Sequence, residues 1–135
     1  MQRYLSRLSG PLLDRIDLHV EAPAVPWSEL SAKATGTDTA SMRAQVIAAR
    51  ERSVRRQGER PNARLKGREL DECMAVETSA RTLLEQAMTQ LGLSARAYDK
   101  IRRVALTISD IAGSETVRPE HVGEAVQYRL LDRKL

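Results

Sequence analysis

The chain has 135 residues, about the length of one domain. Only 3% of the residues are aromatic, 41% are hydrophobic and 30% are charged, so the core must be built from aliphatic side chains, which favours packed helices. The single cysteine, Cys73, excludes an internal disulfide and a multi-cysteine zinc site, and no apolar run approaches the roughly 20 residues that span a bilayer. We therefore expect a cytoplasmic protein with no metal site and no membrane contact.

The first 39 residues do not resemble a complete domain. Ile16, Leu18 and Val20 alternate with polar residues, the period-two pattern of a half-buried strand. One strand without a sheet cannot satisfy its hydrogen bonds, so we expect residues 1 to about 25 to be poorly ordered or to pack opportunistically. Residues 23 to 39 are rich in Pro, Ala, Ser and Thr and indicate a linker, with a short turn near residues 27 to 30.

The remainder of the chain is predicted to fold as four or five helices. Helical spacing and stop signals at Gly58, Gly92 and Gly113 define these segments. The predicted helices cover residues 40 to 57, about 68 to 74, 78 to 91 and 95 to 112, with a last helix that starts at Pro119.

The net charge of +4 is unevenly distributed along these helices. Residues 43 to 68 contain nine Lys and Arg but only two acids, so the rest of the chain carries an acidic excess of three. Such a basic stretch could bind nucleic acid, with Arg52, Arg55 and Arg56 as candidate contacts, or it could dock against acidic partner subunits. The alternative is that this basic stretch binds no ligand and is a helix face exposed to solvent.

Arg96 is the most informative single residue. If Ser94 is the N-cap of the helix at residues 95 to 112, Arg96 lies in the first turn, where a cation costs a few tenths of a kcal/mol. On the helical wheel it shares the polar face with Lys100, Arg103 and Thr107, away from the core. Exposed backbone N–H groups beside a guanidinium form a good receptor for phosphate oxygens, so we expect an anion to bind at Arg96.

The usual chemistry of nucleotide hydrolysis is missing from this sequence. No glycine-rich loop precedes Lys-Ser or Lys-Thr, and no apolar strand ends in paired acids, so we do not expect the chain to be an ATPase by itself. His19 and His121 have no nucleophile partner and are predicted to be structural or surface residues. Arg15, between Asp14 and Asp17, could be held extended for use on a phosphate, with a surface ion pair as the alternative.

At these residues the chain resembles a known family. The run RLSGPLLDRIDLHV at residues 7 to 20 is similar to the segment near the end of the ATPase core in bacterial magnesium-chelatase-like AAA+ proteins, the YifB/ComM family. Further matching stretches follow in order at residues 48 to 50, 62 to 65, 93 to 98, 104 to 105, 107 to 108 and 124 to 129. The resemblance implies the end of an ATPase core at residues 1 to 22, a linker at 23 to 39 and a helical C-terminal lid domain at 40 to 133.

The same resemblance implies roles for two arginines. Arg15 matches the arginine finger that reaches the nucleotide of a neighbouring subunit, and Arg96 matches the sensor-2 arginine of the lid. ATP and Mg²⁺ are then cofactors of the full-length parent protein and are not expected on this fragment. The implied partners are the preceding ATPase core, neighbouring subunits of a hexamer and, as a candidate, DNA, whereas the fragment alone is expected to be a monomer.

The chain departs from the family pattern at two positions of one helix. The family commonly reads Arg-Ile-Leu-Arg-Val-Ala-Arg-Thr over residues 100 to 107, and here leucine and arginine have exchanged places, giving Arg102 and Leu106. No role that needs an arginine at position 106 is therefore carried over.

Two other classes of function remain open from the sequence. A basic helical DNA-binding module predicts binding that weakens steeply with salt. A helical oligomerisation element predicts a mass that depends on concentration.

Overall fold

The computed structural model describes residues 10–13, 15–31 and 36–129. Its elements in chain order are α2 (Gly10–Leu13), α3 (Trp27–Leu30), α4 (Thr39–Gln57), η1 (Asn62–Arg64), α5 (Gly67–Cys73), α6 (Thr78–Leu91), α7 (Ala95–Ala112) and α8 (Pro119–Gln127). These residues form no strand, only an isolated parallel bridge between Val76 and Val117. The predicted all-α fold class is confirmed.

Local capping chemistry explains why α6 ends, and α7 begins and ends, at the residues predicted. Gly92 adopts the left-handed conformation (φ 59°) and the Leu93 N–H donates to the Met88 carbonyl at 3.1 Å, which closes the C-terminus of α6. Ser94 then caps α7, because its Oγ accepts a hydrogen bond from the Ala97 N–H at 3.2 Å. Gly113, with φ 73°, ends α7 in the same way that Gly92 ends α6.

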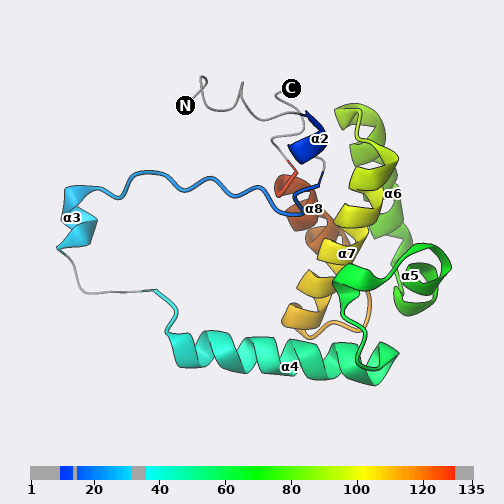
Figure 1. Ribbon diagram of the computed structural model, residues 1–135, viewed down its shortest axis with the longest axis horizontal. Coiled ribbons are helices and arrows are strands. Elements are labelled where there is room, and N and C mark those ends of the chain that lie inside the picture. The colour runs from blue at the N-terminus through cyan, green and yellow to red at the C-terminus, as the bar shows by residue number, and fades with distance from the viewer. Residues whose placement is uncertain (1–9, 14, 32–35, 130–135) are drawn as a thin grey trace.

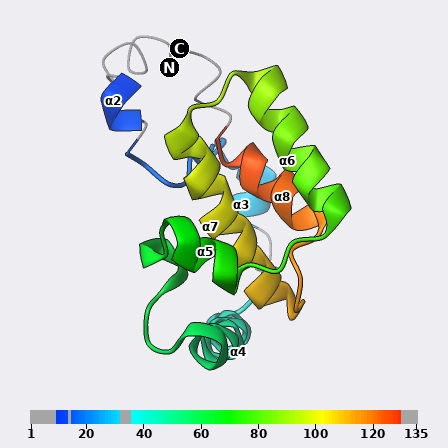
Figure 2. The ribbon, with the colours of Figure 1, turned by 90° about the vertical axis from the view of Figure 1, so that its right-hand side faces the viewer.

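Helix α7 is the centre of the bundle. It packs against α8 and α4, and α6 covers α8 (Figure 2). Ile101 and Ala105 of α7 are completely buried, and burying an aliphatic side chain such as Ile101 stabilises the fold by about 1.5–3 kcal/mol. The buried apolar residues that form this core are Leu65, Leu70, Met74, Ala80, Leu84, Ile101, Ala105, Leu106, Val117, Val122 and Ala125.

The leucine and arginine that have exchanged places on α7 are both buried. Leu106 is 3% exposed and belongs to the apolar core. Arg102 is 8% exposed, forms an ion pair with Asp71 of α5, and has its guanidinium carbon 5.1 Å from the centre of the Tyr98 ring. Because a buried charge needs a partner, Arg102 fastens α5 to α7 through its ion pair with Asp71.

One residue on the polar face of α7 is covered by another segment. Lys100 lies opposite the apolar stripe, but its side chain is only 11% exposed because its ammonium group pairs with the Asp17 carboxylate at 2.8 Å. The helical wheel considers one helix at a time, so it gave no indication that a distant segment covers this part of the polar face.

The N-terminal segment is extended and forms no strand, so the period-two pattern at residues 16 to 20 did not correspond to one. No described strand lies beside it, and its backbone instead bonds to residues just after α8: the His19 N–H donates to the Tyr128 carbonyl at 2.9 Å, and the Ile16 carbonyl accepts from the Arg129 side chain. Residues 20–31, which we call the arm, then lead away from the bundle to α3 (Figure 1). Expectations for residues 1–9 and 14 lie outside the described residues.

Helix α4 lies across one end of the bundle and is covered on one side only (Figures 1 and 2). Asp38 caps its N-terminus, where the carboxylate accepts the Ser41 N–H at 2.8 Å. Only Ala49 of α4 is buried, and four of its apolar side chains are about half exposed. These four side chains are Met42, Val46, Ile47 and Val54.

Candidate functional site

Arg96 is the second residue of α7 and is exposed. The first four amides of a helix have no acceptor within the helix, and the Ser94 side chain satisfies the one at Ala97. The amides of Ala95 and Arg96 therefore point out of the same helix end that carries the Arg96 guanidinium. Anion binding at this helix end stays a prediction, based on an exposed guanidinium beside two outward-directed amides.

Arg15 lies in the turn that follows α2. Its N–H donates to the Leu12 carbonyl at 3.0 Å, and the residue is exposed. The nearby Asp17 carboxylate is paired with Lys100. Asp14, the other acid beside Arg15, lies outside the described residues, so the surface ion pair of Arg15 stays an open alternative.

The segment that carries Arg15 is docked on the helical bundle by three contacts. Asp17 pairs with Lys100 of α7, the His19 N–H donates to the Tyr128 carbonyl, and the Arg129 guanidinium donates to the Ile16 carbonyl. Arg129 is 1% exposed, so its contact with Ile16 is buried at one end. These contacts join the segment of Arg15 to the helix of Arg96, although the two arginines are 81 positions apart in the chain.

Sequence reasoning missed Lys100 and Arg129 as residues of this site. The sequence places Lys100 on the polar face of α7 without a partner, and Arg129 is the last residue of a stretch that resembles the family. The partners of these two residues, Asp17 and Ile16, are distant in the sequence, so no local periodicity indicates the contacts. The one signal in the sequence is that Arg129 lies within a segment that resembles the family.

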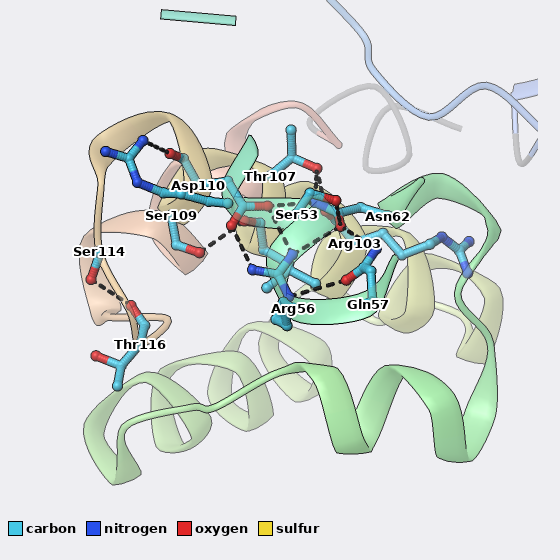
Figure 3. A network of polar contacts seen from close by, with 12 residues as sticks. Ser53, Arg56, Gln57, Asn62, Arg103, Thr107, Ser109, Asp110, Ser114 and Thr116 are labelled. Atoms are coloured by element: carbon cyan, nitrogen blue, oxygen red, sulfur yellow. Dashed lines mark hydrogen bonds and ion pairs between the residues drawn. The ribbon is translucent and has the colours of Figure 1, made fainter. Parts of the chain in front are cut away.

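A second cluster of polar side chains joins α4, η1 and α7 (Figure 3). Arg56 binds both carboxylate oxygens of Asp110, with Nη1 to Oδ1 at 2.6 Å and Nη2 to Oδ2 at 2.9 Å. Asn62 donates to Asp110 Oδ2 at 2.8 Å and accepts from Gln57 at 2.8 Å. The Asp110 side chain is 3% exposed, and its hydrogen bonds raise the pKa of Arg56 above its ordinary value. Arg56 therefore fastens α4 to α7.

The three arginines predicted as nucleic-acid contacts differ in their surroundings. Arg52 donates from Nη1 to the Asp110 backbone carbonyl at 2.9 Å, near the C-terminus of α7 where a cation is favourable. Arg56 is engaged by Asp110, as described above. Arg55 is exposed. Among the described residues, Arg52 and Arg56 hold α4 on the bundle, and Arg55 makes no such contact.

A groove lies between α4, the loop at residues 58–63 and α7. Its volume is about 310 Å³. Val46 and Val54 of α4 and Ile111 of α7 line it and are 48–52% exposed, while Asn62 and Asp110 of the polar cluster form part of its surface. The fold thus leaves an apolar concave surface on the exposed side of α4.

His121 and Cys73 have structural surroundings. His121 is 4% exposed, and its Nδ1 accepts the Arg118 N–H at 3.0 Å at the start of α8. Cys73 is half-buried against the core. Among the described residues, no group of three or more His, Cys, Asp or Glu is arranged to hold a metal ion, and no described helix is both long and apolar enough to cross a membrane.

Comparison with known proteins assigns most of the chain to family models. Residues 36–129 match the model described as magnesium chelatase, subunit ChlI C-terminal, and residues 1–30 match the model described as magnesium chelatase, subunit ChlI. The uncharacterized protein YifB is 45% identical in Salmonella typhimurium and 42% identical in Escherichia coli, in each case over 134 residues and 98% of this chain. The competence protein ComM of Haemophilus influenzae is 38% identical over 136 residues and 100% of this chain. The chain spans 26% of the length of each of these relatives.

Proposed function

The chain belongs to the magnesium chelatase family, through the C-terminal domain of the ChlI subunit, and on this basis we propose that it is the lid, or sensor-2, domain of a AAA+ ATPase. In the full-length parent the lid closes over ATP held by the preceding ATPase core. Hydrolysis then moves the lid as a rigid body within an oligomeric ring.

The N-terminus of α7 fits the phosphates of ATP. It combines an exposed guanidinium at Arg96 with the outward-pointing amides of Ala95 and Arg96 itself. ATP with Mg²⁺ supplies the phosphoryl group that is hydrolysed, and in our proposal the preceding core holds both. Arg96 orients the phosphates and neutralises part of their charge.

The docking of residues 15–19 on the bundle is the observation that carries the proposal. Asp17 and Lys100 join the segment of Arg15 to α7, so that a movement of the lid on binding nucleotide at Arg96 is transmitted to Arg15. Arg15 then acts as the finger for the nucleotide of the neighbouring subunit, where a guanidinium stabilises charge on the transferred phosphoryl group. In this proposal Lys100 and Arg129 are positioning residues that act through Arg15.

Kinetics of the full-length parent test these roles. Arg15→Ala should keep the affinity for a nonhydrolysable ATP analogue but lower turnover about a thousandfold or more, as loss of an arginine finger does. Arg96→Ala should weaken analogue binding about tenfold or more, because a charge-assisted hydrogen bond to phosphate is lost. Arg81→Ala is the matched control, since Arg81 is an exposed arginine near the N-terminus of the neighbouring helix α6. Unchanged turnover and affinity in both test variants would remove the assigned sites.

DNA is a second candidate ligand, favoured by the exposure of Arg43, Arg50 and Arg55 along α4. Arginines spaced along one helix can contact successive phosphates without reading sequence. Binding of this kind would place the substrate of the ring on the basic side of the lid. It predicts affinity that falls steeply with salt.

A further inference from the structure

This chain exposes two apolar features, one on the short helix α3 and one in the groove beside α4. Trp27 and Leu30 of α3 are 81% and 64% exposed, and their i, i+3 spacing places them on one face of the short helix. The groove between α4 and α7 is lined by Val46, Val54 and Ile111, which are each about half exposed. A helix that inserts a pair of large apolar side chains into an apolar groove is a recurring mode of protein recognition.

The charges of the two features are also complementary. The arm contains two carboxylates, Glu21 and Glu29, and no Lys or Arg, and Glu29 lies within α3 between Trp27 and Leu30. Helix α4 contains five arginines and one acid. Arg50 lines the groove and is exposed. An acidic helix with an apolar face therefore fits an apolar groove whose exposed charged lining is two arginines, Arg50 and Arg60, and one acid, Glu59.

The arm and the groove belong to one chain, yet they lie apart in it. Residues 16–19 are fixed to α7 and α8, and the arm leads away from the bundle to α3, at a distance from the part of α4 that contacts α7 (Figure 1). We propose that α3 of one copy docks into the groove between α4 and α7 of a second copy, inserting Trp27 and Leu30 against Val46, Val54 and Ile111.

Such a contact joins two different surfaces, the arm of one copy and the groove of another. When it runs in one direction it produces a ring if the rotation between copies closes, and when two copies exchange arms it produces a two-fold dimer. This inference differs from the sequence-based expectation that the fragment is a monomer, and it does not depend on the nucleotide roles of Arg15 and Arg96.

Trp27 is the only tryptophan of the chain, so its fluorescence reports directly on docking. With increasing concentration of the 135-residue chain, the emission maximum should shift to shorter wavelength while the mass in sedimentation equilibrium rises. Val46→Asp should raise the self-dissociation constant about tenfold or more, since it places an unpaired carboxylate in the apolar contact. Ile47→Asp is the control, because Ile47 is 49% exposed on the same helix and does not line the groove.

A mixing experiment distinguishes contact between copies from folding back within one copy. Leu30→Asp damages the arm and leaves the groove intact, whereas Val46→Asp damages the groove and leaves the arm intact. Each variant alone should stay monomeric with red-shifted Trp27 emission, and an equimolar mixture should form a heterodimer in which the emission of the Val46→Asp copy shifts to shorter wavelength.

Four results would overturn the inference. The first is an emission maximum typical of exposed tryptophan at every concentration, and the second is a blue-shifted maximum that does not depend on concentration, which would indicate docking within one copy. The third is a mixture of the two variants that remains monomeric. If DNA, rather than a second copy, proves necessary for any shift of the Trp27 emission, the contact between copies is likewise excluded.

Discussion

The carboxylate of Asp17 lies 2.8 Å from the ammonium group of Lys100, and this ion pair joins the segment that carries Arg15 to the helix that carries Arg96. The two partners differ in burial, because the Lys100 side chain is 11% exposed and that of Asp17 is 59% exposed. A pair that is open to solvent on one side adds little stability. We therefore interpret the Asp17–Lys100 pair as a contact that fixes the orientation of the Arg15 segment on α7.

Exchanging the charges of this pair tests that interpretation in the full-length parent. Lys100→Ala should lower ATP turnover about tenfold through misplacement of Arg15, yet change the free energy of unfolding by less than about 1 kcal/mol. The double variant Asp17→Lys with Lys100→Asp should recover most of the turnover. If Lys100→Ala keeps full turnover while Arg15→Ala does not, the ion pair has no positioning role, although the role of Arg15 would stand.

The polar cluster around Asp110 should dominate the stability of the contact between α4 and α7. Asp110→Ala leaves Arg56 and Asn62 without their shared acceptor, and we expect a loss of about 3 kcal/mol in urea unfolding. Glu69→Ala is the control, since it removes an ion pair with Arg60 in which both side chains are at least half exposed, and should cost less than about 1 kcal/mol. Equal losses of unfolding free energy in the two variants would contradict the view that burial strengthens the contacts of Asp110.

Acidification should loosen the start of α4 through Asp38. The hydrogen bonds from the Ser41 backbone and side chain lower the pKa of Asp38 below its ordinary value of 3.8. Because the folded-state pKa is the lower one, the cap stabilises α4 above the unfolded-state value and is lost as the pH falls through the folded-state value. The Ser41 amide resonance should therefore shift in acid below pH 3.8. Asp38→Asn keeps a capping acceptor that does not titrate, and the same transition in that variant would exclude Asp38 as its cause.

If DNA binds to α4, Arg55 should contribute more than the arginines that hold the bundle together. Arg55→Gln should reduce the slope of log affinity against log salt by about one, without loss of stability. Arg56→Gln should instead lower the free energy of unfolding, because it removes the bidentate bond to Asp110. Fluorescence anisotropy with a labelled duplex measures the first effect and urea unfolding the second. Salt-independent affinity, or none, would eliminate DNA as a ligand of this surface.

Local signals predicted the helices well because the residues that end them act locally. Ser94, Gly92 and Gly113 cap α6 and α7 within one turn of where they lie in the sequence. The exposure of Arg96 likewise follows from helical periodicity, since it lies opposite the apolar stripe.

Contacts between distant segments were not predictable in this way. Lys100 lies on the polar face of α7 by periodicity and is nevertheless covered by Asp17. Arg56 belongs to a basic stretch that suggested nucleic acid, whereas Asp110, 54 positions later, binds it bidentately. Charge patterning gives the number of arginines on a helix, but the three-dimensional fold decides which of them remain available to a ligand.

Hydrogen exchange in the full-length parent tests the proposed lid function most directly. With a saturating ATP analogue and Mg²⁺, amides in the first turn of α7, at Ala95 and Arg96, should exchange more slowly than in the protein without nucleotide, while the first turn of α6 at Thr78 should be unaffected. Exchange at the start of α7 that does not change when the nucleotide site is full would contradict the assignment of this chain as the domain that closes over the phosphates.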